Sequence, residues 1–364
     1  KGTPKYSAKD FSRIIQRNGG MNNAFTTKDY TAYFEVMASD RINIPIDIES
    51  DRMTNIILDP KETVSERNVI MEERRLRYED DPQNSLFESI VATAFRAHPY
   101  RRPVIGWMAD ISSLQRDDLH NHYKEYYAPN NAFIVVVGDV NADQMLEKIK
   151  ASFGDKKSSV IKKSSATKEP EQKGEKRIYL KKEAELPYVI AGYHTPSFPH
   201  EDSFALEVLN SILSGGKSSR LYKSLIYEKK TALNAAADYS GTYLEPFLFL
   251  LWGTPAQGKD AAELEKGLYA EVESIKEAPP LEREVQKAKN QIEASFVFSQ
   301  DSLYVQAIKI GQFEILGGWK LMDAYIEGIR KVTPEDVQRV AKKYLVDDNR
   351  TVGTLVPLKA RSEK

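Results

Sequence analysis

The sequence contains no cysteine among its 364 residues, which excludes disulfide bonds and metal sites built from thiolates. It also lacks an uninterrupted apolar run of about 18 residues, so no membrane-spanning helix is expected. Net charge is nearly absent, because 52 lysines and arginines stand against 53 aspartates and glutamates. A chain with so little net field is not typical of proteins that bind nucleic acids or acidic membrane surfaces.

The length and one solvated stretch indicate two domains. A chain of 364 residues is long for a single domain and can bury two cores. Residues 155–176 read DKKSSVIKKSSATKEPEQKGEK, which is rich in lysine, serine and glutamate and offers little to bury. We therefore predict an N-terminal domain over residues 1–155, a linker over 156–174 and a C-terminal domain over 175–364.

The two halves share a helix–turn–strand pattern. Tyr126 and Asn131 recur 218 residues later as Tyr344 and Asn349, and in each half a helix ending in Lys-x-Tyr leads through a polar turn into an apolar strand. In the first half that strand is AFIVVVGDV, residues 132–140. The repetition predicts an α+β fold of two homologous α/β sandwich domains related by duplication. Chance likeness of such units is the alternative.

The most informative segment is DPKETVSERNVIMEERRLRYEDD, residues 59–81, which we expect to form one helix. Its proline and early acidic residues are typical of a helix start. Glu66 and Glu73 lie seven residues apart, so they share one face of the helix, only about 20° apart around its axis.

Val69 and Ile70 fall between the two glutamates on that face, which predicts that Glu66 and Glu73 lie in the buried stripe of the helix. Buried carboxylates require a cation. The helix alone leaves several partners open: a metal ion, an arginine of the core, or solvent at the edge of a wider stripe.

Several segments in order along the chain resemble one family. NAFTTKDYTAYFEV, SERNVIMEE, HPYRRPVIG and SGGKSSRLY are similar to segments of the pitrilysin/insulinase zinc peptidases, which include the β subunit of mitochondrial processing peptidase. The resemblance extends over nearly the whole chain. It implies a zinc-dependent endopeptidase that encloses peptides or unfolded segments in a chamber.

The resemblance also implies a metal site that this chain completes only in part. In the family a helix carries H-x-x-E-H, in which two histidines bind zinc and the glutamate is the general base. A segment like Lys1-Gly2-Thr3 follows that motif, so we expect the motif just before Lys1. Glu73 matches the third zinc ligand and Glu66 the auxiliary carboxylate of the catalytic site. This chain alone is then expected to bind zinc poorly and to be inactive.

Asn23, Ala24 and Phe25 match the family's substrate-binding edge strand. An extended peptide can pair with such a strand through its main chain, largely independently of sequence. A plain strand after the Gly19-Gly20 turn is the alternative.

The second half departs from the family pattern. Relatives carry an arginine and, seven residues later, a tyrosine that reach the substrate, but Tyr227 and Asn234 stand at these positions here. The departure favours a heterodimer in which this chain is the catalytic subunit and a homologous partner supplies the arginine and tyrosine. A homodimer is the alternative.

Two other patterns do not indicate a functional site. Gly215-Gly216-Lys217-Ser218 lacks the first glycine and the preceding strand of a phosphate-binding loop, so it reads as a loop between helices. His120 and His122 cannot share a metal ion, because they are about 200° apart on a helix.

A non-catalytic structural or interaction subunit of the same fold is the rival functional hypothesis. The absence of cysteine and the likeness to bacterial members favour a periplasmic location, with the cytoplasm and the mitochondrial matrix as alternatives.

Overall fold

A computed structural model describes residues 2–161 and 167–358 of the chain. These residues form two compact units, neither of which is continuous in sequence. The first unit comprises residues 1–75, 104–165 and 302–307, and the second comprises 76–103, 166–301 and 308–364. Among the described residues, no helix combines the length and the apolar content that a membrane crossing requires.

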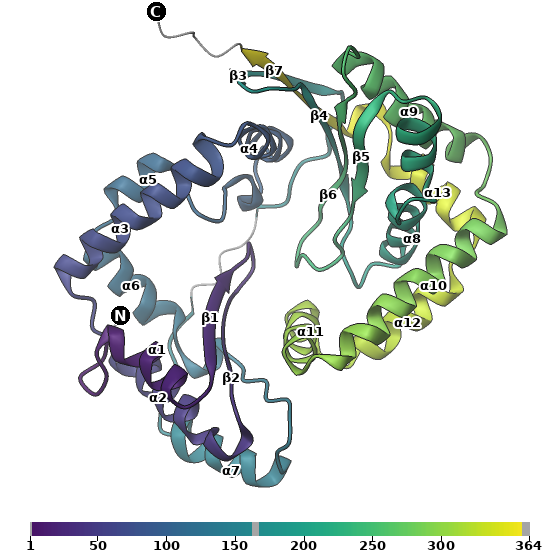
Figure 1. Cartoon of the computed structure of the whole chain (residues 1–364). Coiled ribbons are helices and arrows are strands. Elements are labelled where there is room, and N and C mark those ends of the chain that lie inside the picture. The colour runs from purple at the N-terminus through teal and green to yellow at the C-terminus, as the bar shows by residue number, and fades with distance from the viewer. Residues whose placement is uncertain (1, 162–166, 359–364) are drawn as a thin grey trace, which may run out of the picture. The chain divides into compact units, whose positions relative to one another are not determined.

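The first unit is mostly helical and contains one β-hairpin (Figure 1). The strands of the hairpin are antiparallel, and Asn23 lies opposite Phe34. Ile15 and Ile48 are fully buried in this unit. Its elements are α1 (Ala8–Arg17), β1 (Met21–Thr26), β2 (Thr31–Val36), η1 (Ser39–Arg41), α2 (Asn43–Asn55), α3 (Pro60–Arg74), α5 (Met108–Ser113), α6 (Arg116–Tyr126), η4 (Pro129–Asn131) and α7 (Ala142–Phe153).

The strand expected at residues 132–140 is not formed, so this prediction was wrong. The segment runs extended but belongs to no ladder, and Phe133 and Ile134 are about half exposed. A strand requires a hydrogen-bonded neighbour, and β1 and β2 pair only with each other among the described residues. A short apolar run marked this segment as a strand but could not supply its neighbour.

The second unit is built on a five-stranded sheet with the order β3-β7-β4-β6-β5. Only β3 and β7 are parallel. The strands are β3 (Lys176–Glu183), β4 (Tyr188–Thr195), β5 (Ala232–Asp238), β6 (Phe247–Pro255) and β7 (Arg350–Leu358). The helical elements are η2 (Arg75–Glu79), α4 (Pro82–Ala94), η3 (Pro99–Arg101), α8 (Asp202–Ser214), η5 (Tyr222–Glu228), α9 (Ala261–Glu277), α10 (Glu282–Phe298), η6 (Ser299–Asp301), α11 (Leu303–Leu316), α12 (Leu321–Lys331), α13 (Pro334–Tyr344) and η7 (Asp347–Asn349), of which η2 and α11 begin in the first unit.

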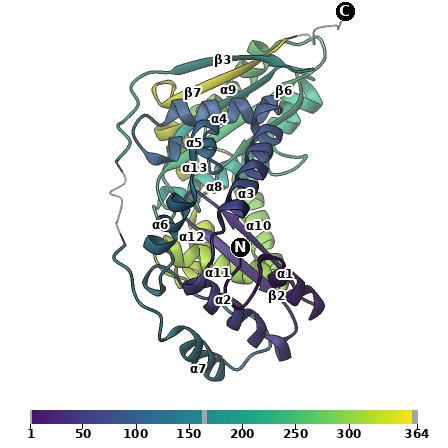
Figure 2. The ribbon, with the colours of Figure 1, turned by 90° about the vertical axis from the view of Figure 1, so that its left-hand side faces the viewer.

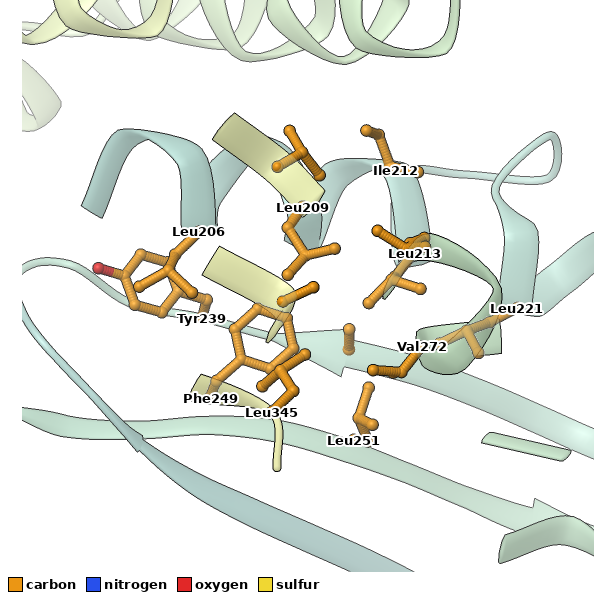
Figure 3. Packing of buried hydrophobic residues seen from close by; sticks show 14 of the residues in the cluster. Leu206, Leu209, Ile212, Leu213, Leu221, Tyr239, Phe249, Leu251, Val272 and Leu345 are labelled. Atoms are coloured by element: carbon orange, nitrogen blue, oxygen red, sulfur yellow. The ribbon is translucent and has the colours of Figure 1, made fainter. Parts of the chain in front are cut away.

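Helices cover both faces of this sheet. On one face α8, α9 and α13 enclose the largest apolar cluster, in which Leu209 and Leu213 of α8 lie over Phe249 of β6 (Figure 3). On the other face lies α4, as both Figure 1 and Figure 2 show. Because both faces are covered, nearly every residue of β4 and β6 is buried.

The position of α4 could not be read from the order of the sequence. Leu86 and Ile90 are fully buried against β4 and β7, so a helix from the first half of the chain completes the core built by the second half. Gly353 of β7 allows this approach, because a Cβ added there would lie 2.7 Å from Ile90 Cδ1. The covering helix thus requires a residue without a side chain at this point.

The predicted internal repeat is confirmed in atomic detail. Helices α6 and α13 begin and end exactly 218 residues apart, as do the turns η4 and η7 that follow them. In the first copy Asn131 donates a hydrogen bond of 2.9 Å to the carbonyl oxygen of Tyr126, and in the second Asn349 donates one of 2.8 Å to that of Tyr344. After the turn the two copies diverge, because β7 has strand neighbours and residues 132–140 have none.

Candidate active site

The predicted carboxylate helix exists. Asp59 caps α3, since its side chain accepts hydrogen bonds from the amides of Lys61 at 2.8 Å and Glu62 at 3.0 Å. Pro60 is the first helical residue, where its missing amide hydrogen is not needed. The helix continues from Arg74 into the π-helical turn η2 and ends at Glu79. The predicted start of the helix at Asp59 and Pro60 is therefore confirmed.

The buried face of α3 was predicted wrongly. Val69 is 58% exposed and Glu66 is exposed, whereas Thr63 and Arg74 are buried. Two arginines occupy the inner face: Arg67 donates to the carbonyl oxygen of Leu114 at 2.8 Å, and Arg74 to that of Gly106 at 2.7 Å. These carbonyl oxygens lie at the two ends of α5, which is distant in sequence, so the apolar pattern of the helix could not show which face would be covered.

Glu66 and Glu73 still share one face. They lie two turns apart, about 10 Å along the axis, with Glu73 half-buried and Glu66 exposed. Both side chains have polar or electrostatic partners within the protein. The neighbouring Glu72 points elsewhere and pairs with Arg75. Both site carboxylates therefore remain on the accessible side of the helix.

Carboxylate oxygen suits zinc as a ligand, but zinc in a peptidase site needs three protein ligands. Among residues 2–161 and 167–358, no three histidine, aspartate or glutamate side chains are grouped so that they could hold a metal ion. The described part of the chain therefore offers Glu73 as one candidate zinc ligand, with Glu66 two helical turns away. Histidines from elsewhere would have to complete it, as the H-x-x-E-H resemblance implies.

The proposed substrate residues lie in the middle of β1. One side of β1 pairs with β2, and no described strand pairs with the other side. Asn23 Oδ1 accepts a hydrogen bond of 2.8 Å from the amide of Ala24, so that amide is bonded locally and not to β2. Phe25 packs edge-on against Tyr30 with ring centres 5.9 Å apart. This edge is therefore open to an added strand.

The two residues that replace the arginine and tyrosine have different surroundings. Tyr227 is 72% exposed at the end of η5. Asn234 lies beside a bulge in β5, and its side-chain oxygen accepts a hydrogen bond of 2.9 Å from the amide of Thr254. Asn234 thus holds β5 and β6 together. The Gly215–Ser218 segment lies after α8 and before η5, with Gly216 at a φ of 83°, as expected for a loop between helices.

One charged cluster beside the hairpin was not found from the sequence. Glu35 of β2 lies against Glu49 and Arg52 of α2, and burial together with Glu49 raises the pKa of Glu35 to about 8. Arg52 stacks 3.7 Å above the ring of Tyr33. The Tyr33 hydroxyl lies 2.6 Å from that of Tyr127. No local pattern marked Glu35, because an acidic residue in an amphipathic hairpin usually faces solvent.

Comparison with known proteins shows the family of this chain. Residues 1–107 match the family described as insulinase, peptidase family M16, and residues 113–292 match its M16 inactive domain. The chain is 31% identical over 362 residues to the zinc protease PqqE of Helicobacter pylori, which covers 98% of this chain and 81% of that protein. This chain belongs to peptidase family M16.

Other similarities support the assignment. The chain is 27% identical to an uncharacterized zinc protease, YmxG, of Bacillus subtilis, over 96% of this chain and 84% of that one. The crystal structure of a protease from Helicobacter pylori is 30% identical and superposes with a TM-score of 0.93, over 98% of this chain and 87% of that one. An M16-like peptidase from Alicyclobacillus acidocaldarius, 19% identical, shares the fold with a TM-score of 0.82 over 96% of this chain and 83% of that one. The predicted fold of two M16-type domains is confirmed.

Proposed function

We propose that this chain carries one side of the zinc site of an M16 endopeptidase. The observation that supports the proposal most is the placement of Glu66 and Glu73 on one accessible face of a well-capped helix, in a chain whose relatives are named zinc proteases. The proposed substrate is a peptide or an unfolded segment.

In this mechanism Glu73 would bind the metal ion, and Glu66 would orient the site or neutralise its charge. Two histidines and the general base would come from an H-x-x-E-H segment, as the family resemblance implies. When bound, zinc polarises the scissile carbonyl and lowers the pKa of a water molecule. Asp59 and Pro60 contribute by fixing the start of α3, which sets the rotation of both carboxylates about the helix axis.

The open edge of β1 aligns the peptide. When the peptide binds, the amide of Ala24 donates to a carbonyl oxygen of the substrate in place of Asn23 Oδ1. When the peptide leaves, this amide donates to Asn23 Oδ1 again and is not left without a hydrogen-bond partner. Main-chain pairing gives affinity with weak sequence preference. Phe25 and its aromatic neighbours hold the strand flat while the peptide binds.

We further propose that the active enzyme is a heterodimer with an enclosed chamber. Tyr227 and Asn234 stand where an arginine and a tyrosine would reach the substrate, and Asn234 already serves the sheet. A homologous partner would supply the missing pair, and a homodimer is the alternative. We propose a periplasmic location, which fractionation of the source cells would test.

Metal analysis tests the zinc site. A longer chain that includes the H-x-x-E-H segment should hold about one zinc ion per molecule. Glu73→Gln should lose it, because the amide that replaces the carboxylate is a poor zinc ligand. Glu72→Gln is the matched control, since Glu72 is adjacent but pairs with Arg75 on another face, and it should keep the metal.

A second candidate function is that of a non-catalytic subunit. Its support is the match of residues 113–292 to the M16 inactive domain. Zinc-free protein with an intact fold would favour this candidate and refute the zinc site. Zinc retained in Glu73→Gln would instead refute Glu73 as the ligand.

A further inference from the structure

The helix that carries Glu73 does not end at the proposed metal site. It continues for six residues to Glu79, because Arg75 keeps helical angles of −56° and −55° and leads directly into η2. Six residues correspond to about 9 Å of helix. What holds the far end of this helix therefore also affects where Glu73 lies.

Lys182 of β3 binds that far end. Its ammonium group donates to the carbonyl oxygen of Glu79, lies 3.4 Å from that of Tyr78, and donates to Ser85 Oγ at 2.6 Å. Ser85 Oγ in turn donates to the Tyr78 carbonyl oxygen. The last carbonyl oxygens of a helix lack partners within the helix and carry partial negative charge, so a cation there satisfies and stabilises them.

Lys182 and its partner Ser85 lie on elements that are themselves paired or packed. Its strand, β3, pairs along its whole length with β7, where Lys182 lies opposite Pro357. Ser85 belongs to the first turn of α4, whose start is capped by Asp81. α4 itself is packed on the sheet through fully buried side chains. The end of the Glu73 helix is thus held by a strand and by a helix of the second unit.

We infer that Lys182 is a positioning residue for the metal ligand Glu73. By holding the carbonyl end of η2, it limits the shift and rotation of the continuous helix and keeps the Glu73 carboxylate in place before the metal binds. The inference rests on the proposed zinc site. It assigns to the second half of the chain a direct influence on metal affinity, although Lys182 touches neither metal nor substrate.

Zinc titration of the longer chain with its H-x-x-E-H segment tests the inference. Lys182→Met removes the ammonium group and keeps the aliphatic stem, and it should weaken zinc binding about 10-fold, as loss of residues that orient metal ligands does. Lys182→Arg should restore most of the affinity, since a guanidinium can also donate to the two carbonyl oxygens. Lys181→Met is the matched control, because Lys181 is the exposed neighbour on the opposite face of β3 and should leave zinc affinity unchanged.

Hydrogen exchange of the metal-free protein gives an independent measurement. The amides of residues 75–79 should exchange about 10-fold faster in Lys182→Met and at the original rate in Lys181→Met, since loss of a cap frees the last turn to open. Should Lys182→Met fail to fold, Ser85→Ala removes the bridging hydroxyl and should produce the same two effects more weakly. Equal zinc affinity in the folded Lys182 or Ser85 variant and in the unaltered protein would overturn the inference alone. An unaltered protein that binds no zinc would overturn the proposed function as well.

Discussion

The packing of α4 on the sheet of the second unit predicts a specific non-additive pair of substitutions. Ile90 of α4 is fully buried and faces Gly353 of β7, where an added Cβ would lie 2.7 Å and 2.9 Å from two carbon atoms of Ile90. Ile90→Ala removes three buried carbons and leaves a cavity, so it should lower the free energy of unfolding by about 3–4 kcal/mol. Gly353→Ala overfills the same place and should cost about 1–3 kcal/mol.

The double variant should be little worse than Ile90→Ala alone, because the new methyl group of residue 353 enters the cavity left by the isoleucine. The interaction energy should therefore offset about 1–3 kcal/mol of the summed cost. Urea unfolding followed by tryptophan fluorescence, to which Trp252 beside the same apolar cluster contributes, measures all four proteins. Val69→Ala is the control, since Val69 is 58% exposed on α3 and should change stability by less than about 0.5 kcal/mol.

If the stability costs of Ile90→Ala and Gly353→Ala add to within about 0.5 kcal/mol in the double variant, residues 90 and 353 do not contact each other. The placement of α4 in the second unit would then be wrong. An Ile90→Ala cost below about 1 kcal/mol would lead to the same conclusion, because truncating a fully buried isoleucine lowers the free energy of unfolding by more than this.

Two further predictions concern buried carboxylates. The pKa of Glu35 is raised to about 8 from an ordinary value of about 4.5. Ionisation of this carboxyl group should therefore lower the free energy of unfolding as the pH rises from about 4.5 to about 8. Glu35→Gln should remove that dependence on pH in thermal unfolding measured across this range. The pKa of Asp202 is held below its usual range mainly by its hydrogen bonds with Lys343, Tyr344 and Arg339, against the effect of burial, so its contribution is present above about pH 4 and is lost as pH falls. Asp202→Asn should cost about 1–3 kcal/mol at pH 7, because the buried carboxylate accepts charge-assisted hydrogen bonds from Arg339 and Lys343, whose side chains are about half exposed. A cost unchanged between pH 7 and pH 3 would contradict this account.

The division of the chain into units matters for the proposed site. Residues 76–103 follow the Glu73 helix directly and belong to the second unit. The helix that would carry the metal ligand is therefore continuous with the core of the second half.

Much of the local structure followed from short stretches of sequence. Asp59 and Pro60 defined the start of α3, and the spacing of seven placed Glu66 and Glu73 on one face, because capping and helical periodicity depend only on near neighbours. The internal repeat also depends on near neighbours. Asn131 and its counterpart Asn349 each donate to a carbonyl oxygen five residues earlier, so similar local sequences form similar turns. The family resemblance was carried by the same kind of short segments.

Tertiary structure decided what covers each element. Arg74 donates to the carbonyl oxygen of Gly106, 32 residues away, on a face of α3 that the apolar pattern did not predict to be buried. Residues 132–140 had the composition of a strand but no neighbour to pair with. α4 had an apolar face that could have covered any sheet, and Gly353 of β7 permits the close approach of Ile90 that the structure shows. Sequence periodicity describes one element at a time, whereas burial is a property of two surfaces that meet.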